Sequence, residues 1–270
     1  MSQIQSIFDP GAESIILLKM DTQSALFLRP LPGGGCFFAL RENEIMKIAS
    51  IFKKVLMAIT GLLLIGFLVS HLAGNLLIYA GADTFNGYAS LLESKPLLVD
   101  AAEIGLLLIF LLHIFMAITL TGENSAARPA SYEVRKTAGE STLASRTMWY
   151  TGMVVFVFVV LHVYHFKFGA KKDGEAMALW QLVTGEFHKP WVVGLYVAAM
   201  ALLGLHISHG IGSMFQSLGL FSANRRKVRM LGALIGWILV IGFASLPLYS
   251  FLVLPAKDVK TPVTEKAPQK

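Results

Sequence analysis

Residues 97–121 read LLVDAAEIGLLLIFLLHIFMAITLT, and this stretch decides the fold of the chain. It is long enough to cross a bilayer, because a membrane-spanning α-helix needs about 20 consecutive apolar residues. Its two acidic residues, Asp100 and Glu103, both lie near its start. Within lipid the backbone polar groups have to be hydrogen bonded inside the segment, so the stretch is predicted to be helical.

Four more stretches have the same character, namely residues 51–80, 147–168, 190–217 and 228–254. The whole chain is 55% hydrophobic and only 15% charged, which is too apolar for a soluble domain of 270 residues. The sequence therefore predicts an all-α membrane protein, a bundle of five transmembrane helices. The polar segments between the stretches are expected to be turns and loops.

The two ends of the chain differ from this bundle. Residues 1–45 contain several prolines and a run of glycines, and they show neither a sustained period nor the pattern of a signal peptide. Met46 opens MKIASIFKKVL, which resembles a natural amino terminus. We therefore expect residues 1–45 to be a disordered or spurious extension, residues 46–254 to be the membrane domain and residues 255–270 to be a disordered tail.

Charge and cysteine content narrow the class of protein. A net charge of +6 in so apolar a chain is typical of basic helix ends that face anionic lipid, so the expected partner is membrane lipid and not nucleic acid. If the helices cross the membrane in alternating directions, every arginine after Met46 lies on the same side of the membrane as the amino terminus. Basic residues are enriched in cytoplasmic loops, so this side is predicted to be the cytoplasm. The single cysteine, Cys36, excludes an internal disulfide framework and a CxxC metal site.

Six of the seven histidines lie inside the apolar stretches. Ionisable residues are costly in lipid, and their presence indicates a function by default. A lone histidine could hydrogen bond across a helix interface, but four helices that each contribute at least one are hard to explain in that way. The six are His71, His113, His162, His165, His206 and His209, whereas His188 lies in the FHKPW loop and is expected to be a solvated interface residue.

Alternating helix directions sort these histidines into two layers. The histidine of the first stretch and one histidine of the third lie toward the outer face, while the histidine of the second and one of the fourth lie toward the inner face. The rise of 1.5 Å per residue separates the layers by roughly 10–15 Å. The outer layer is thus His71 with His162 or His165, and the inner layer is His113 with His206 or His209.

The pairing of histidines without cysteine or carboxylate indicates the kind of cofactor. Two ligands are too few for a zinc or di-iron site. Haem iron needs only axial ligands and accepts imidazole on both sides, so the bundle is predicted to enclose two b-type haems. Glycines beside the histidines could let the flat macrocycle approach the backbone, or they could simply allow close helix packing; they are Gly74, Gly204, Gly210 and Gly212.

Four segments carry a resemblance to a known family: GFLVSHLAGNLLIYAGADTFNGY, LLHIFMAITL, VFVVLHVYHFKFG and LLGLHISHGIGSMFQSLG. Over residues 50–253 the chain resembles the single-chain, two-haem cytochrome b subunit of succinate dehydrogenases and fumarate reductases. The resemblance implies that His71 and His162 are the axial ligands of the outer haem. It likewise implies that His113 and His206 bind the inner haem iron, and that His165 and His209 lie beside the ligands or near the haem propionates.

The same resemblance implies partners and a role. Members of the family anchor a flavoprotein subunit with covalent FAD and an iron–sulfur subunit in the bacterial inner membrane. Electrons from succinate then pass through the iron–sulfur subunit and the two haems to a quinone, with menaquinone expected. The chain would be the electron-transfer subunit of this oxidoreductase, without catalytic residues of its own. It has neither a cysteine cluster nor a dinucleotide-binding motif with which to carry the cofactors of the soluble subunits.

Glu103 is the only acid well inside a predicted span, and we expect it to relay protons at a quinone site near the outer haem. A partly solvated residue near a helix start is an equally good interpretation. Two other functions stay open: the cytochrome b subunit of a nitrate reductase or hydrogenase, and a proton-coupled transporter. A transporter needs polar residues along a pore, and it would lack a b-type absorption spectrum.

Overall fold

The computed structural model describes the chain in two compact units, Met1–Val55 and Leu56–Lys270, and the boundary between them falls within the first helix. The first unit holds short strands, and the second holds the long apolar helices. The described residues are 4–7, 15–19, 25–30, 36–39, 42–126, 143–169, 171–172, 175–176, 178–220 and 225–255.

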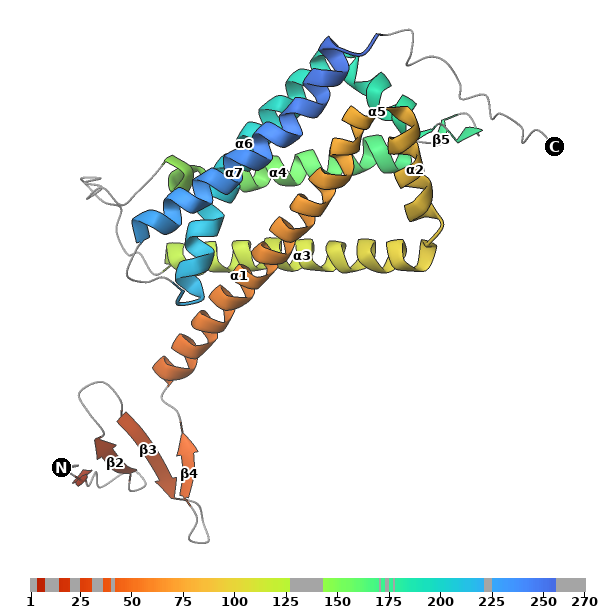
Figure 1. Ribbon diagram of the computed structural model, residues 1–270. Coiled ribbons are helices and arrows are strands. Elements are labelled where there is room, and N and C mark those ends of the chain that lie inside the picture. The colour runs from red at the N-terminus through yellow and green to blue at the C-terminus, as the bar shows by residue number, and fades with distance from the viewer. Residues whose placement is uncertain are drawn as a thin grey trace. The chain divides into compact units, whose positions relative to one another are not determined.

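The first unit contains an antiparallel sheet with the strand order β1-β2-β3-β4 (Figure 1). Each strand has only four to six residues, so an alternating pattern has few repeats in which to appear, and the sequence shows no sustained period. Whether residues 1–45 are a spurious extension stays a prediction. The strands are β1 (Ile4–Ile7), β2 (Ile15–Lys19), β3 (Ala25–Pro30) and β4 (Cys36–Ala39).

Among the described residues, five helices are long and apolar enough to cross a membrane, which confirms the predicted class of an α-helical, multi-pass membrane protein. The spans run Ser50–Ala80, Pro96–Ala126, Arg146–Phe168, Pro190–Ser217 and Arg226–Leu252. They belong to α1 (Glu42–Asn75) with the 3₁₀ turn η1 (Leu76–Ala80), α3 (Pro96–Ala126), α4 (Leu143–Val163) with the π-helical turn η2 (Tyr164–Phe168), α6 (Pro190–Ser217) and α7 (Arg225–Leu252). The tail expected to be disordered lies outside the described residues, apart from Pro255.

Two short helices occupy segments for which turns were predicted. They are α2 (Ala82–Glu93) and α5 (Leu179–Phe187), and they pack against each other. The rings of Phe85 and Trp180 lie 6.0 Å apart, and the Asn86 side-chain oxygen accepts a hydrogen bond of 3.0 Å from the Trp180 backbone N–H. That bond satisfies one of the free N–H groups at the start of α5. A short hairpin precedes α5. Its two strands, β5 (Lys171–Lys172) and β6 (Glu175–Ala176), have two residues each.

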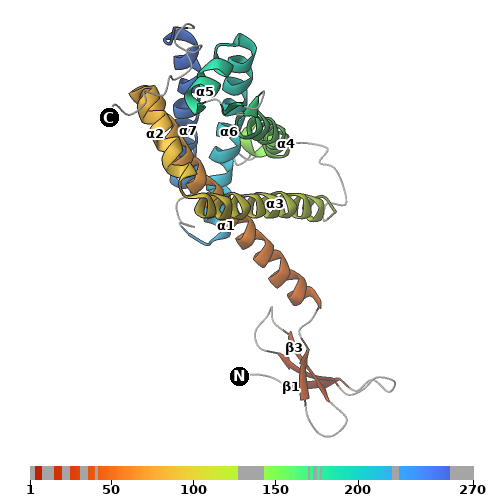
Figure 2. The same ribbon diagram turned by 90° about the vertical axis from the view of Figure 1, so that its right-hand side faces the viewer.

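The closest helix packing joins α6 to α7, which lie side by side in Figures 1 and 2. Small residues four positions apart let the two backbones meet. A Cβ added to Gly232 would lie 2.9 Å from the Ser208 carbonyl oxygen, and one added to Gly236 would lie 3.0 Å from the Gly204 carbonyl oxygen. Spacing of this kind is a common means of close helix association in membranes.

Three of the four glycines noted beside the histidines, namely Gly74, Gly204 and Gly212, lie against a neighbouring helix, and Gly210 has only Met148 at 4.0 Å from an added Cβ. Gly204 faces Val240 and Gly212 faces Arg229, both on α7. Gly74 faces the ring of Tyr88 on α2, where an added Cβ would lie 2.8 Å from the ring edge.

Candidate functional site: two histidine pairs

The first histidine pair joins α1 to α4, and we call it the α1–α4 pair. The ring centroids of His71 and His162 lie 5.8 Å apart, and the ring planes are nearly perpendicular at 88°. Aromatic side chains surround the two rings. Phe243 of α7 lies 5.9 Å from His71, Phe158 lies 5.8 Å from His162, and the Tyr196 hydroxyl of α6 lies 3.5 Å from His162 Nδ1.

The second pair joins α3 to α6, and we call it the α3–α6 pair. The ring centroids of His113 and His206 lie 6.5 Å apart at an interplanar angle of 65°. The four histidines of the two pairs therefore come from four different membrane helices, and all four are half-buried. The structure brings together the same partners that the sequence analysis assigned to each layer.

Each histidine of the α3–α6 pair contacts a buried threonine on a neighbouring helix. Thr60 Oγ1 of α1 lies 3.1 Å from His113 Nδ1, and Thr151 Oγ1 of α4 lies 3.4 Å from His206 Nδ1. The threonines are only 2% and 3% exposed, so water does not compete for these contacts. Sequence reasoning missed both residues, although each is followed by a glycine.

The threonine contacts give the spacing between the two pairs. Thr60 and His71 are eleven positions apart on α1, and so are Thr151 and His162 on α4. At 1.5 Å per residue, each separation is about 16 Å along the helix. On α6, Tyr196 contacts His162 and lies ten positions before His206, which gives about 15 Å. The three helices thus give a spacing of about 15–16 Å, at or just above the upper limit of the predicted range.

The other intramembrane histidines, His165 and His209, each lie three positions after a member of a pair. His165 falls in the π-helical turn η2, where its ring contacts Tyr164 and Phe166 and its buried Nδ1 has no hydrogen-bond partner. Turns of the π type occur frequently at functional sites. His209 follows His206 by three positions on α6 and is also half-buried. The sequence spacing left His162 and His165 equivalent, and the structure places His162 against His71.

Asn75, four positions after His71 in the first of the four quoted segments, contacts that histidine. Its side-chain amide donates to the His71 carbonyl oxygen at 2.8 Å, and the same nitrogen lies 3.4 Å from His71 Nε2. The side chain thus adds a hydrogen bond to the His71 carbonyl oxygen in the last turn of α1.

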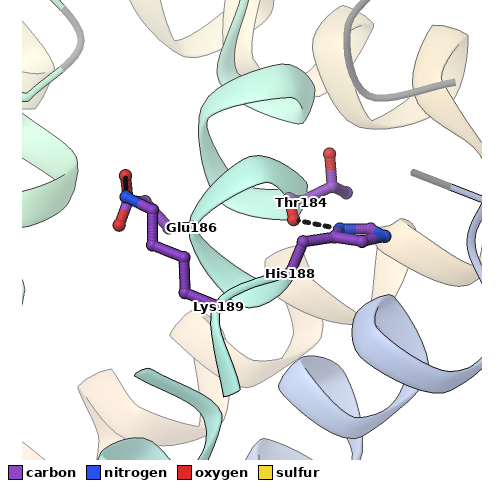
Figure 3. A network of polar contacts seen from close by, with 4 residues as sticks. All are labelled: Thr184, Glu186, His188 and Lys189. Carbon is purple, nitrogen blue, oxygen red and sulfur yellow. Dashed lines mark hydrogen bonds and ion pairs between the residues drawn. The ribbon is translucent and has the colours of Figure 1, made fainter. Parts of the chain in front are cut away.

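His188 is held between two carbonyl groups, although a solvated residue was predicted. Its Nδ1 lies 2.7 Å from the Thr184 carbonyl oxygen, and its Nε2 lies 3.0 Å from the Leu254 carbonyl oxygen. Figure 3 shows the first of these contacts at the end of α5, together with the ion pair between Lys189 and Glu186. His188 thus links the end of α5 to the residues after α7.

Glu103 forms an ion pair with Lys167 of the η2 turn. Both side chains are nearly half exposed, at 45% and 48%. The lysine lies far away in the sequence, so the spacing of charges along the chain could not predict the contact. The ion pair connects the candidate proton-relay residue to the helix that carries His162.

Among the described residues, no cluster of three or more histidine, cysteine, aspartate or glutamate side chains could hold a metal ion by themselves. Comparisons of the chain with models of protein families, with curated proteins and with solved structures find no match.

Proposed function

We propose that the chain is a two-haem cytochrome b, the membrane subunit of a succinate:quinone oxidoreductase. The observation that carries this proposal is the presence of two facing histidine pairs, contributed by four membrane helices. A lone histidine at a helix interface has an ordinary structural explanation. Two pairs of half-buried histidines, each with ring centroids no more than 6.5 Å apart, are better explained by a ligand that both members of a pair hold.

The ring centroids of the two pairs lie 5.8 and 6.5 Å apart. At these separations, His71 and His162 would be close enough to hold one iron between them, and His113 and His206 another. Neutral imidazole donors in an apolar, aromatic setting are the ligands expected for a b-type haem.

The helices that carry three of the four histidines have few buried residues. In the apolar windows of α1, α3 and α4, the buried share is 17%, 6% and 6%, against 39% for α6 and 33% for α7. Lipid covers the outward faces of such helices. On the proposed function, a bound haem would cover part of the inward faces, where the histidines lie.

When bound, two b-type haems would supply one-electron transfer across the membrane. His71 and His162 would hold one iron, and His113 and His206 the other. The protein itself orients the imidazoles, excludes water with apolar and aromatic side chains and keeps the two sites about 16 Å apart.

The partners follow from the same proposal. Flavoprotein and iron–sulfur subunits would dock at the membrane face nearer the α3–α6 pair. At that end, the starts of α4 and α7 present the basic residues Arg146, Arg226 and Lys227, all of which are exposed. A quinone, with menaquinone expected, would react near Glu103 and the α1–α4 pair. The amino terminus would then be cytoplasmic, in a bacterial inner membrane.

The experiment is to purify the full chain from membranes and to quantify haem with a reduced-minus-oxidised spectrum. We expect two b-type haems per chain, with one lost in His162→Ala and the other lost in His113→Ala. The matched controls, His165→Ala and His209→Ala, should keep both. A colourless wild-type protein would refute the haem proposal, and loss of haem from His165→Ala but not from His162→Ala would reverse the assignment on α4.

Co-purification tests the identity of the complex separately. A red protein that never associates with a flavoprotein and an iron–sulfur protein, and whose haems succinate does not reduce in membranes, would instead be the haem subunit of another oxidoreductase.

A further inference from the structure

Two threonine–glycine dipeptides face the α3–α6 pair from opposite sides. Thr60-Gly61 lies on α1 and faces His113, and Thr151-Gly152 lies on α4 and faces His206. A Cβ added to Gly61 would lie 3.6 Å from His113 Cε1, and one added to Gly152 would lie 3.3 Å from His206 Cε1. The threonine thus contacts a ring nitrogen while the glycine leaves room for the adjacent ring carbon.

The same dipeptide recurs in the sequence at a fixed distance from the histidines of the other pair. On α1 the order is Thr60, Gly61, nine further residues and His71. On α4 it is Thr151, Gly152, nine further residues and His162. Each of these helices therefore supplies one histidine to the α1–α4 pair and, about three turns earlier, one threonine–glycine contact to the α3–α6 pair.

The hydrogen bonding of the threonines determines which ring nitrogen carries the proton. The Thr60 hydroxyl lies 3.0 Å from the carbonyl oxygens of Leu56 and Met57, and the Thr151 hydroxyl lies 3.1 Å from that of Met148. A hydroxyl has one hydrogen, and a carbonyl oxygen can only accept. Because each hydroxyl donates to its own helix, its oxygen is left to accept a hydrogen bond from the histidine Nδ1–H.

We propose that Thr60 and Thr151 are positioning residues that hold His113 and His206 as the Nδ1–H tautomer, with the Nε2 lone pair free for a metal. This inference rests on the proposed function, because the metal in question is haem iron. A histidine ligand normally donates its second N–H to an acceptor, which fixes the ring orientation and raises the basicity of the ligand. For His113 the acceptor is a hydroxyl instead of the more usual carboxylate or carbonyl. His206 also hydrogen bonds to the Met148 backbone, so Thr151 shares this positioning role with a carbonyl group.

The test replaces each hydroxyl by a methyl group of similar shape in the full chain, as Thr60→Val and Thr151→Val. Loss of the acceptor should make the imidazole a weaker donor and favour the reduced iron. At a fixed ambient potential, the reduced-to-oxidised ratio of one haem should rise about two- to tenfold, as expected for loss of one ordinary hydrogen bond. The other haem should not change, and the low-spin electron paramagnetic resonance signal of the affected haem should shift.

Two further variants separate hydrogen bonding from packing. Thr119→Val makes the same chemical change on α3, where the hydroxyl bonds only to the Phe115 carbonyl oxygen at 2.8 Å, and it should leave both haems as in the wild type. Thr151→Ser keeps the hydroxyl and should restore the wild-type ratio.

The outcomes distinguish the two proposals. If the wild type binds two haems but Thr60→Val and Thr151→Val behave like Thr119→Val, the positioning role is wrong and the haem proposal stands. If Thr151→Ser changes the reduced-to-oxidised ratio as Thr151→Val does, the side chain acts through packing, and the hydrogen-bond inference is overturned. A wild-type chain that binds no haem would refute the proposed function itself.

Discussion

Replacing Gly236 by alanine should disrupt a close contact between α6 and α7. The new Cβ would lie 3.0 Å from the Gly204 carbonyl oxygen and 3.2 Å from the Ser208 backbone nitrogen, both on α6. Ordinary contacts of this kind begin at 3.4 Å, so α6 and α7 would have to separate by a few tenths of an ångström. The Ser208 hydroxyl, 2.6 Å from the same position, would also have to move.

The energetic cost combines two terms of opposite sign. Overpacking a well-packed interface costs about 1–3 kcal/mol. Alanine recovers up to roughly 1 kcal/mol through its better helix propensity. The net loss of about 1–2 kcal/mol should lower the midpoint of thermal unfolding in detergent by about 2–8 °C for a domain of this size.

A matched control uses Gly194 on α6, where an added Cβ has no neighbour within 4 Å. Gly194→Ala should leave the unfolding midpoint unchanged or raise it slightly, because only the propensity term remains. If Gly236→Ala is no less stable than Gly194→Ala, the close α6–α7 contact described here is wrong.

Three other predictions concern the ends of the helices and the start of the chain. His188→Ala should lower the unfolding midpoint clearly more than Lys189→Ala. It removes a ring that lies against two carbonyl oxygens and at least one hydrogen bond worth about 1 kcal/mol, while Lys189 forms an exposed ion pair worth less. Equal effects would contradict the role of His188 in linking α5 to the residues after α7. Glu103→Gln should keep both haems and succinate oxidation with a soluble acceptor but slow quinone reduction, unlike Asp100→Asn; unchanged quinone reduction would exclude the relay. A chain that starts at Met46 should insert and bind haem as the full chain does, and amino-terminal sequencing that finds upstream residues in the native protein would refute the proposed start.

The sequence predicts the spans and the pairing of depths because both depend on one-dimensional quantities. Length and hydropathy determine which segments can cross a bilayer. Helix rise and alternating direction then determine the depth of each histidine. Depth leaves two candidate partners for His71 and two for His113.

The contacts between side chains of different helices could not be predicted from the sequence, because they depend on how each helix is rotated about its axis. The contact of Thr60 with His113 requires the phase of both helices, and a pattern of apolar residues all round a helix does not encode that phase. The turn η2 changes the direction of the side chains after His162, so the rule that residues three apart share a face does not apply to His165. The helices α2 and α5 are short, and the glycine and asparagine of their segments resemble turn signals.

Because the two histidine pairs are divided among four helices, they are completed one after the other during synthesis of the chain. The ribosome delivers α1, α3, α4, α6 and α7 in succession. The pair of His71 and His162 has both members once α4 has emerged, whereas His113 has to wait for α6. A nascent chain thus passes through a stage with one complete pair and one solitary histidine. The last helix to emerge, α7, brings no histidine, and it joins the bundle by packing against the helix that completed the second pair.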